Sequence, residues 1–237
     1  MTAPNIQTNH SINSSGSVAS LAYSSALAPN SLMIVTVMWQ GSQVGLPTVS
    51  GAQNGSFGAS KVSFNHATYY NGIAIFALVN TQGAVSETIN FSYINCGTIS
   101  NATVVIDEFS GYSAVADGYN SQDQESYSSG TGATSSGNFT PLVNGDLIYA
   151  ASTIGYIAGG SLTTYTHGTN FINTYNGPAA SAGVQTEYYV QPTAAQIAGT
   201  FTTNTGVTFS TYAVAVALKK AALWLENGYW QHPPYQQ

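Results

Sequence analysis

Catalysis requires polar side chains that meet at one substrate, and this sequence offers few candidates. Asp107 and Glu108 are adjacent in a predicted strand, where neighbouring side chains point to opposite faces, so they are not expected to cooperate. Val104 and Ile106 share the face of Glu108. The favoured interpretation is a carboxylate hydrogen-bonded to backbone at a strand end, and no catalytic residue is assigned.

Metal and nucleophile chemistry have equally little support. His10, His66, His167 and His232 are scattered without HExxH or HxH spacing, and no GxSxG motif occurs. Cys96 is the only cysteine, which excludes an internal disulfide and a cysteine-rich zinc site. The sequence therefore predicts no metal, no cofactor and no enzymatic activity.

Asp117 to Glu125 is predicted to be an acidic loop, because three carboxylates lie within these nine residues. Calcium prefers roughly six to eight oxygen ligands from flexible segments of this kind. The spacing does not match an EF-hand loop. A solvated acidic loop is the favoured interpretation, and calcium binding is the alternative.

The charge content excludes several partners. Lys and Arg together number 3, Asp and Glu number 9, and the formal net charge is −6 over 237 residues. So few cations give no electrostatic basis for binding nucleic acid or anionic membranes. No GxxxxGK[ST] or GxGxxG loop is present to hold a nucleotide phosphate.

Tyrosine is the residue type that keeps one ligand class open. The chain holds 16 Tyr, some in adjacent pairs such as Tyr69-Tyr70 and Tyr188-Tyr189. Tyrosine suits neutral, hydroxyl-rich partners because it has a flat apolar face and a polar tip. Strands also favour tyrosine for their own packing, so cell-surface carbohydrate is an open partner and not a deduced one.

Strand patterns recur along the chain. Ser31 to Trp39 is an apolar, β-branched run of the kind that is buried on both faces. Phe64 to Tyr70 and Ile73 to Val79 flank Asn71-Gly72, which predicts a hairpin that turns on these two residues. Ser126 to Asn138 is polar and is predicted to be a loop. Further strands are predicted at Glu87 to Ile94, Ala102 to Phe109, Asp146 to Thr153, Gly183 to Val190, Gly199 to Thr203 and Tyr212 to Leu218.

The same order of strands occurs twice. Four predicted strands between Leu32 and Phe109 are followed by four similar ones between Leu147 and Leu218. This predicts an all-β, antiparallel, jelly-roll-like sandwich of two similar four-strand halves with a C-terminal extension. Helix is expected to be scarce.

Short motifs in this order resemble a known domain. They include "NSLMIVTVMW", "VVIDEFSG", "NGDLIYAAS" and "YAVAVALKK". The chain from Leu21 to Lys219 resembles a jelly-roll-like β-sandwich domain of phage virion proteins and of secreted bacterial surface proteins. The resemblance implies attachment, decoration or adhesion, with no shared catalytic residues.

Three segments are expected on this basis: an N-terminal arm (1–20), the sandwich domain (21–220) and an aromatic C-terminal tail (221–237). The tail fits a short helix or a hairpin on Asn227-Gly228 equally well. Its apolar side chains must fold back on the sandwich or enter a partner. The predicted partner-binding anchor consists of Trp224, Leu225, Tyr229, Trp230 and Tyr235.

The sequence favours a non-enzymatic structural subunit of a large assembly, such as a capsid decoration, minor capsid or tail component of a phage. Its expected partners are copies of itself and other structural proteins of that assembly. Met1 to Asn5 lacks the basic start of an export signal, and no apolar run is long enough for a membrane span. The expected location is a virion assembled in the host cytoplasm. The alternatives are an extracellular filament or surface-layer subunit joined by strand exchange, and a carbohydrate-binding module.

Overall fold

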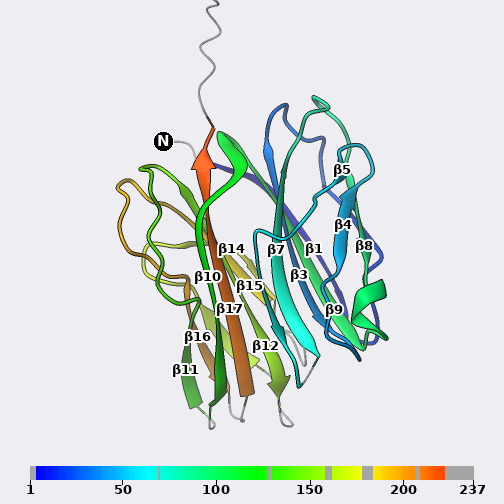
Figure 1. Cartoon of the computed structure of the whole chain (residues 1–237), viewed down its shortest axis with the longest axis vertical. Helices are drawn as coiled ribbons and strands as arrows, with labels where there is room; N and C mark the ends of the chain where they lie inside the picture. Colours follow the sequence, from blue (N-terminus) through cyan, green and yellow to red (C-terminus); the bar gives the residue numbers. More distant parts are fainter. Residues whose placement is uncertain are drawn as a thin grey trace, which may run out of the picture.

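The computed structural model describes residues 4–68, 70–127, 130–157, 162–177, 184–205 and 209–221. Within these residues the chain is built from antiparallel strands and one short 3-10 helix, η1 (Ile94–Cys96). Figure 1 shows the strands stacked in layers that run roughly along the long axis. The predicted all-β sandwich is confirmed.

The N-terminal half forms two sheets. Its inner sheet has the order β1-β9-β3-β7-β6, and its outer sheet has the order β2-β8-β4-β5. The strands are β1 (Asn5–Asn13), β2 (Ser20–Ala22), β3 (Leu32–Gln40), β4 (Thr48–Gly51), β5 (Gly55–Ser56), β6 (Val62–His66), β7 (Asn71–Val79), β8 (Thr88–Ser92) and β9 (Asn101–Phe109).

The C-terminal half repeats this plan. Its inner sheet has the order β10-β17-β12-β15-β14, and its outer sheet has the order β11-β16-β13. The strands are β10 (Tyr112–Tyr127), β11 (Gly130–Ser135), β12 (Leu147–Ile157), β13 (Leu162–Thr166), β14 (Ile172–Asn176), β15 (Val184–Val190), β16 (Thr200–Thr205) and β17 (Phe209–Lys220).

Each half is therefore a two-sheet, jelly-roll-like sandwich in its own right. The four strands predicted in each half are present, and shorter or more polar strands complete each sheet. The correspondence of strand orders shows that β3 is equivalent to β12, β7 to β15 and β9 to β17. The repeated order in the sequence thus marks two stacked sandwiches.

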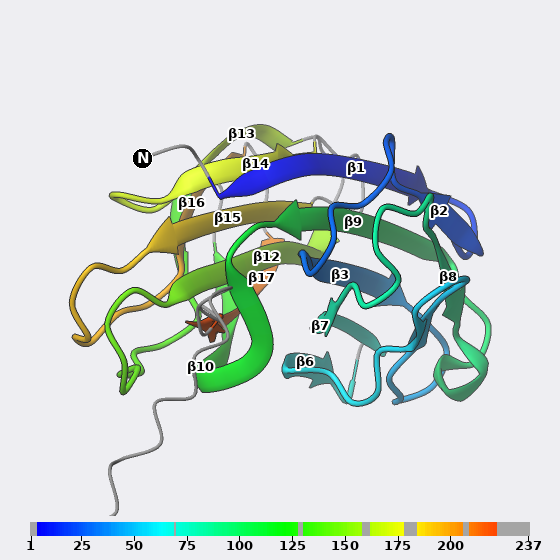
Figure 2. The same ribbon diagram turned by 90° about the horizontal axis from the view of Figure 1, so that it is seen from above.

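The two inner sheets pack face to face, which gives four layers of sheet (Figure 1). β1 of the first half lies beside β14 of the second, and β6 lies against β10 (Figure 2). Because β1 is equivalent to β10 and β6 to β14, each half presents the same pair of edge strands to the other. This is the arrangement of a two-fold-related pair within one chain.

The double-sided burial explains the continuous apolar runs. In β3, Met33 and Val35 face the outer sheet, whereas Leu32 and Ile34 face the other half, and all four are fully buried. Side chains alternate between faces along a strand, so a strand in the middle of a four-layer stack needs apolar residues at every position. Burying each such side chain contributes about 1.5–3 kcal/mol.

The hairpin of β6 and β7 is confirmed, but its predicted turn position is wrong. Asn71 and Gly72 lie inside β7, where they pair with His66 and Asn65 of β6, and the chain turns just before them. A Cβ on Gly72 would lie 2.5 Å from the ring of Trp39. This glycine therefore makes room for the buried indole and does not shape a turn.

The predicted loop from Ser126 to Asn138 is also corrected. Gly130–Ser135 form β11, which pairs with β16 along its whole length. Main-chain hydrogen bonds hold this strand in an outer sheet, and Thr134 is buried where its hydroxyl meets Thr211 at 2.6 Å. A strand at the outside of the stack needs few apolar residues, so its sequence resembles that of a loop.

The segment assigned to an N-terminal arm contains β1. This strand, Asn5–Asn13, pairs with β9 and forms one edge of the inner sheet. The side chains of this strand are polar apart from two isoleucines, Ile6 and Ile12, which are exposed. An edge strand of this composition carries no hydrophobic signal that distinguishes it from an arm.

Candidate functional site

Asp107 and Glu108 lie on opposite faces of β9, as predicted. Asp107 points toward the second half and accepts hydrogen bonds from the Tyr149 hydroxyl at 2.5 Å and the Thr174 hydroxyl at 3.3 Å. Glu108 points toward the outer side and accepts from the Gln7 amide at 2.6 Å. The two carboxyl groups do not face one site.

The Asp107 carboxyl is fully buried between the halves. Burial raises its pKa to about 6, although hydrogen bonds from Thr8, Tyr149, Thr174 and Asn5 favour the charged form. The Tyr149 hydroxyl also lies 3.2 Å from the hydroxyl of Thr36. Asp107 is thus the centre of a polar network that joins the two halves.

Glu108 binds backbone, in agreement with the favoured interpretation of the sequence. Its Oε1 accepts the N–H of Ala28 at 2.6 Å, which fixes the chain just before β3. Glu87 acts in the same way, because it accepts the N–H groups of Gln53 and Asn54 at 3.0 Å each. These carboxylates satisfy buried donors that would otherwise be costly.

The predicted acidic loop is wrong, since Asp117 to Glu125 lie in strand β10. Asp117 forms an ion pair with Lys219 at 3.0 Å and accepts the N–H groups of Leu142 and Val143 at 2.6 and 2.9 Å. These hydrogen bonds and the Lys219 charge hold the pKa of Asp117 below its ordinary value against the effect of burial, which acts in the opposite direction. The side chains of Asp123 and Glu125 lie outside the described residues.

The three histidines that the structure describes contact different residues. The ring of His10 lies 4.2 Å from that of Tyr175, His66 lies near Tyr212, and His167 contacts the carbonyl of Gly168. His232 falls outside the described residues. In the part of the chain that the structure describes, no three His, Cys, Asp or Glu side chains gather as a metal site requires.

The predicted tail anchor is not placed. Trp224, Leu225, Tyr229, Trp230 and Tyr235 all lie outside the described residues, which end at 221. The structure does place the point where the tail begins. The N–H of Ala221 donates to the carbonyl of Gly111 at 2.9 Å, so the tail leaves beside the start of β10.

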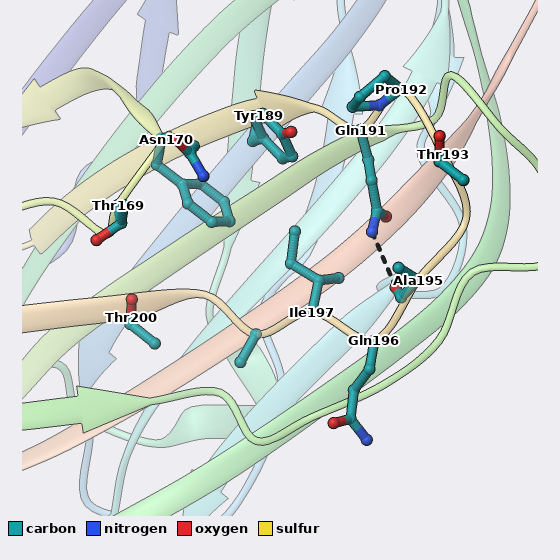
Figure 3. A pocket seen from close by; sticks show the side chains of 12 residues that line it. Thr169, Asn170, Tyr189, Gln191, Pro192, Thr193, Ala195, Gln196, Ile197 and Thr200 are labelled. Atoms are coloured by element: carbon teal, nitrogen blue, oxygen red, sulfur yellow. Dashed lines mark hydrogen bonds between the residues drawn. The ribbon is translucent and has the colours of Figure 1, made fainter.

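A groove that lies mainly on the C-terminal half is one concave feature of the described surface. It consists of two adjoining hollows, with volumes of about 340 and 610 Å³, which share Asn170 and Tyr189. Figure 3 shows the smaller hollow, with Thr169 and Asn170 on one side and the loop that contains Thr193 and Gln196 on the other. We call the two hollows together the Tyr189 groove.

The larger hollow lies toward the origin of the tail. Tyr112, Ile172, Tyr188 and Val190 contribute apolar surface there, and Lys220 contributes a charge. The predicted tyrosine pair is divided between two roles. Tyr188 is almost fully buried, with its ring centroid 5.1 Å from that of Phe109, whereas Tyr189 is half-buried and packs beside Phe171.

Glu187 lies beneath the Tyr189 groove and joins its two walls. Its carboxyl accepts the N–H of Gly168 at 2.8 Å, next to Thr169 of one wall, and the N–H of Thr200 at 3.3 Å in the other. Burial raises the pKa of Glu187 to about 8, although the hydrogen bonds from Gly168 and Thr200 favour the charged form. These two hydrogen bonds position both walls of the groove.

Of the groove residues, only the adjacent pair Tyr188-Tyr189 carries a signal in the sequence. Asn170, Gln191 and Gln196 come from loops, and the spacing of these residues in the chain carries no motif. Asn170 adopts the left-handed conformation, with φ of 72°. Asn tolerates this region better than most residues, so an asparagine at this position is compatible with a tight loop.

Comparisons with known proteins add no family to this description, since no family model, curated protein or solved structure matches the chain. Among the residues that the structure describes, no helix has the length and apolar character of a membrane span.

Proposed function

We propose that this chain is a non-enzymatic structural subunit of a large assembly, in the role of a capsid decoration, minor capsid or tail component of a phage virion. An apolar surface beside an unpaired strand edge carries this proposal. Val115 of β10 is 56% exposed, and Leu142 and Val143, whose N–H groups bind Asp117 of the same strand, are 81% and 43% exposed. We call these three residues the β10 patch.

The geometry of the β10 patch favours a rigid contact surface. Asp117 lies between Val115 and Tyr119 in the chain and binds the N–H groups of Leu142 and Val143, which fixes the loop against the strand. β10 pairs only with β17 within its sheet, so its other edge presents main-chain groups. Exposed apolar residues at a strand edge are typical of protein-protein contacts.

A neighbouring copy of the chain is the occupant that we propose for the β10 patch. The tail leaves from β17, the partner strand of β10, and its first residue bonds to Gly111 just before β10. The β10 patch and the origin of the tail therefore lie on the same pair of strands, β10 and β17. In the proposal, the patch of one copy and the tail of the next form one joint, with Trp224 and Trp230 buried in the neighbour.

The contacts of the carboxylates support the absence of catalysis in this proposal. Asp107, Glu108, Glu87, Glu187 and Asp117 each accept hydrogen bonds that fix backbone or join the halves. A general acid or base needs a free face toward a substrate. These five side chains are instead used by the fold.

Incorporation of variants into the assembly tests the proposal. Trp224→Ala/Trp230→Ala and, separately, Leu142→Ser should fold with unchanged thermal stability and lose incorporation, because interface tryptophans contribute at least about 2 kcal/mol each. Ile94→Ser is the matched control, since Ile94 is 82% exposed but lies in η1 of the other half. Normal incorporation of both variants, or equal loss in the control, would contradict the joint.

A further inference from the structure

We propose that the Tyr189 groove binds a neutral oligosaccharide. This proposal does not rest on the assembly role, because the groove and the β10 patch are formed by different residues. It identifies carbohydrate as a partner class and assigns it a site.

The lining combines an aromatic face with neutral hydrogen-bonding groups. Tyr189 and Phe171 supply rings 5.8 Å apart, and Thr169, Asn170 and Gln196 present exposed hydroxyl and amide groups around them. Sugar rings have apolar C–H faces and hydroxyl edges, so they match a surface of this composition. The volume of each hollow lies in the range of small-ligand sites.

Gln191 provides a second observation that points to a ligand. Its side chain is 5% exposed and its Nε2 donates to the carbonyl of Ala195 at 2.9 Å, the dashed line in Figure 3. Its Oε1 has no hydrogen-bond partner among the described residues. A buried acceptor without a donor is costly, and such a group in the wall of a pocket marks a place for an outside donor.

The equivalent residue of the first half shows that this acceptor need not be left unpaired. Asn80 follows β7 as Gln191 follows β15, and each exchanges backbone hydrogen bonds with the segment before the central strand. The Asn80 Oδ1 accepts the N–H of Gln82 at 3.0 Å. In the second half the residue two positions after Gln191 is Thr193, but the Gln191 Oε1 has no hydrogen-bond partner among the described residues, and both residues line the groove.

Charge narrows the ligand class. Among the residues that the structure describes, Lys220 is the only charged one that lines either hollow, and no carboxylate lines them. A single cation at one end does not favour a polyanionic ligand, and the absence of a lining carboxylate pair removes the groups that glycoside hydrolysis requires. The groove is therefore suited to hold a neutral sugar without cleaving it.

The experiment measures binding of the full chain to a panel of linear hexasaccharides. Neutral glucose, galactose, mannose and N-acetylglucosamine oligomers are compared with a sulfated and a sialylated hexasaccharide. We expect at least one neutral oligomer to bind and both anionic ones to bind at least tenfold more weakly. Tyr189→Ala and Gln196→Ala should each weaken binding at least tenfold, whereas Tyr119→Ala, a tyrosine on β10, should leave it unchanged.

Two outcomes would overturn the proposal. One is that no neutral oligomer binds, or that binding survives both groove substitutions. The other is that a peptide of residues 222–237 occupies the groove, with sensitivity to Tyr189→Ala, while no sugar does. Gln196 is exposed, so Gln196→Ala keeps the test valid if Tyr189→Ala fails to fold. If the chain binds a sugar but does not enter an assembly, the groove proposal stands and the proposed function is contradicted.

Discussion

The interiors of the two halves differ at one end of the sandwich. Val37 of β3 pairs with Ala74, and both are packed in the apolar core of the first half. At the equivalent place in the second half, Ser152 of β12 pairs with Gln185, and both side chains are fully buried. The same backbone plan is therefore filled with hydrocarbon in one half and with hydroxyl and amide groups in the other.

This difference shows which parts of the plan depend on apolar residues. The middle of each inner sheet is apolar in both halves, because it is covered on both faces. The end of the second half is maintained by main-chain pairing and by contacts such as that of Thr134 with Thr211. Polar burial adds less stability than apolar burial and requires specific partners.

The contact between the halves has a second asymmetry. By pairing register, Ile34 of β3 is equivalent to Tyr149 of β12, and Asp107 of β9 is equivalent to Val216 of β17. On one side of the approximate two-fold arrangement, Ile34 and Val216 are thus both buried in the apolar core between the halves. The other side is the hydrogen-bonded pair of Asp107 with Tyr149.

The largest expected effect comes from making this contact symmetric. Asp107→Val and Tyr149→Ile introduce the residue types found at the equivalent positions. Each single change should lower the free energy of unfolding by about 1–3 kcal/mol, because the remaining partner is left buried with too few hydrogen bonds. The double variant should lose less than the sum of the two, with a coupling energy of about 1–3 kcal/mol in urea unfolding.

The matched cycle uses Ile34→Val and Val216→Ala on the apolar side of the same contact. Its coupling energy should be below about 0.5 kcal/mol, because neither residue leaves a polar group unpaired. Equal coupling in the two cycles would show that packing, and not the hydrogen bond, connects Asp107 with Tyr149.

A second effect, which is smaller over any single pH unit, concerns pH. The folded-state pKa of Glu187, about 8, is above its ordinary value of 4.5, so the folded chain binds more protons than the unfolded chain between these values. Stability should therefore fall as pH rises through this window, by at most about 1.4 kcal/mol per pH unit, and level off above pH 8. Asp107 has a similar effect that ends near pH 6.

Glu187→Gln isolates the contribution of Glu187, because between pH 6 and 8 it removes the decline that this carboxyl causes. Urea unfolding of both proteins at pH 6, 7 and 8 measures the difference. Parallel decline in the variant and the wild type would mean that the Glu187 carboxyl does not titrate in this range.

Much of the inner architecture could be predicted from the sequence. The apolar run that became β3 indicated a strand covered on both faces, and the repeated order of the predicted strands indicated two similar halves. The outer and edge strands could not be predicted in this way. β1 and β11 are held by main-chain pairing and contain few apolar residues, so their sequences carry no alternating hydrophobic signal.

The Tyr189 groove could not be predicted from the sequence either, because no local pattern marks its residues. Tyr189, Asn170 and Gln196 come from separate segments, and only the packing of the C-terminal half brings them together. At Asn71-Gly72 the sequence did carry a local signal, but the turn that it predicted is wrong. The dipeptide has a strong turn preference, but the volume of Trp39 decided the position of the glycine.

The composition of the purified particle tests the assembly role most directly. Particles are sedimented from the culture that produces the chain, in low and in high sodium chloride, and their proteins are quantified by mass spectrometry. We predict a fixed molar ratio of this chain to the other particle proteins that salt does not change, because the chain has only 12 charged residues, 3 basic and 9 acidic, to form screened contacts. A chain that is absent from the particles, present in a variable ratio, or released by moderate salt would contradict the account.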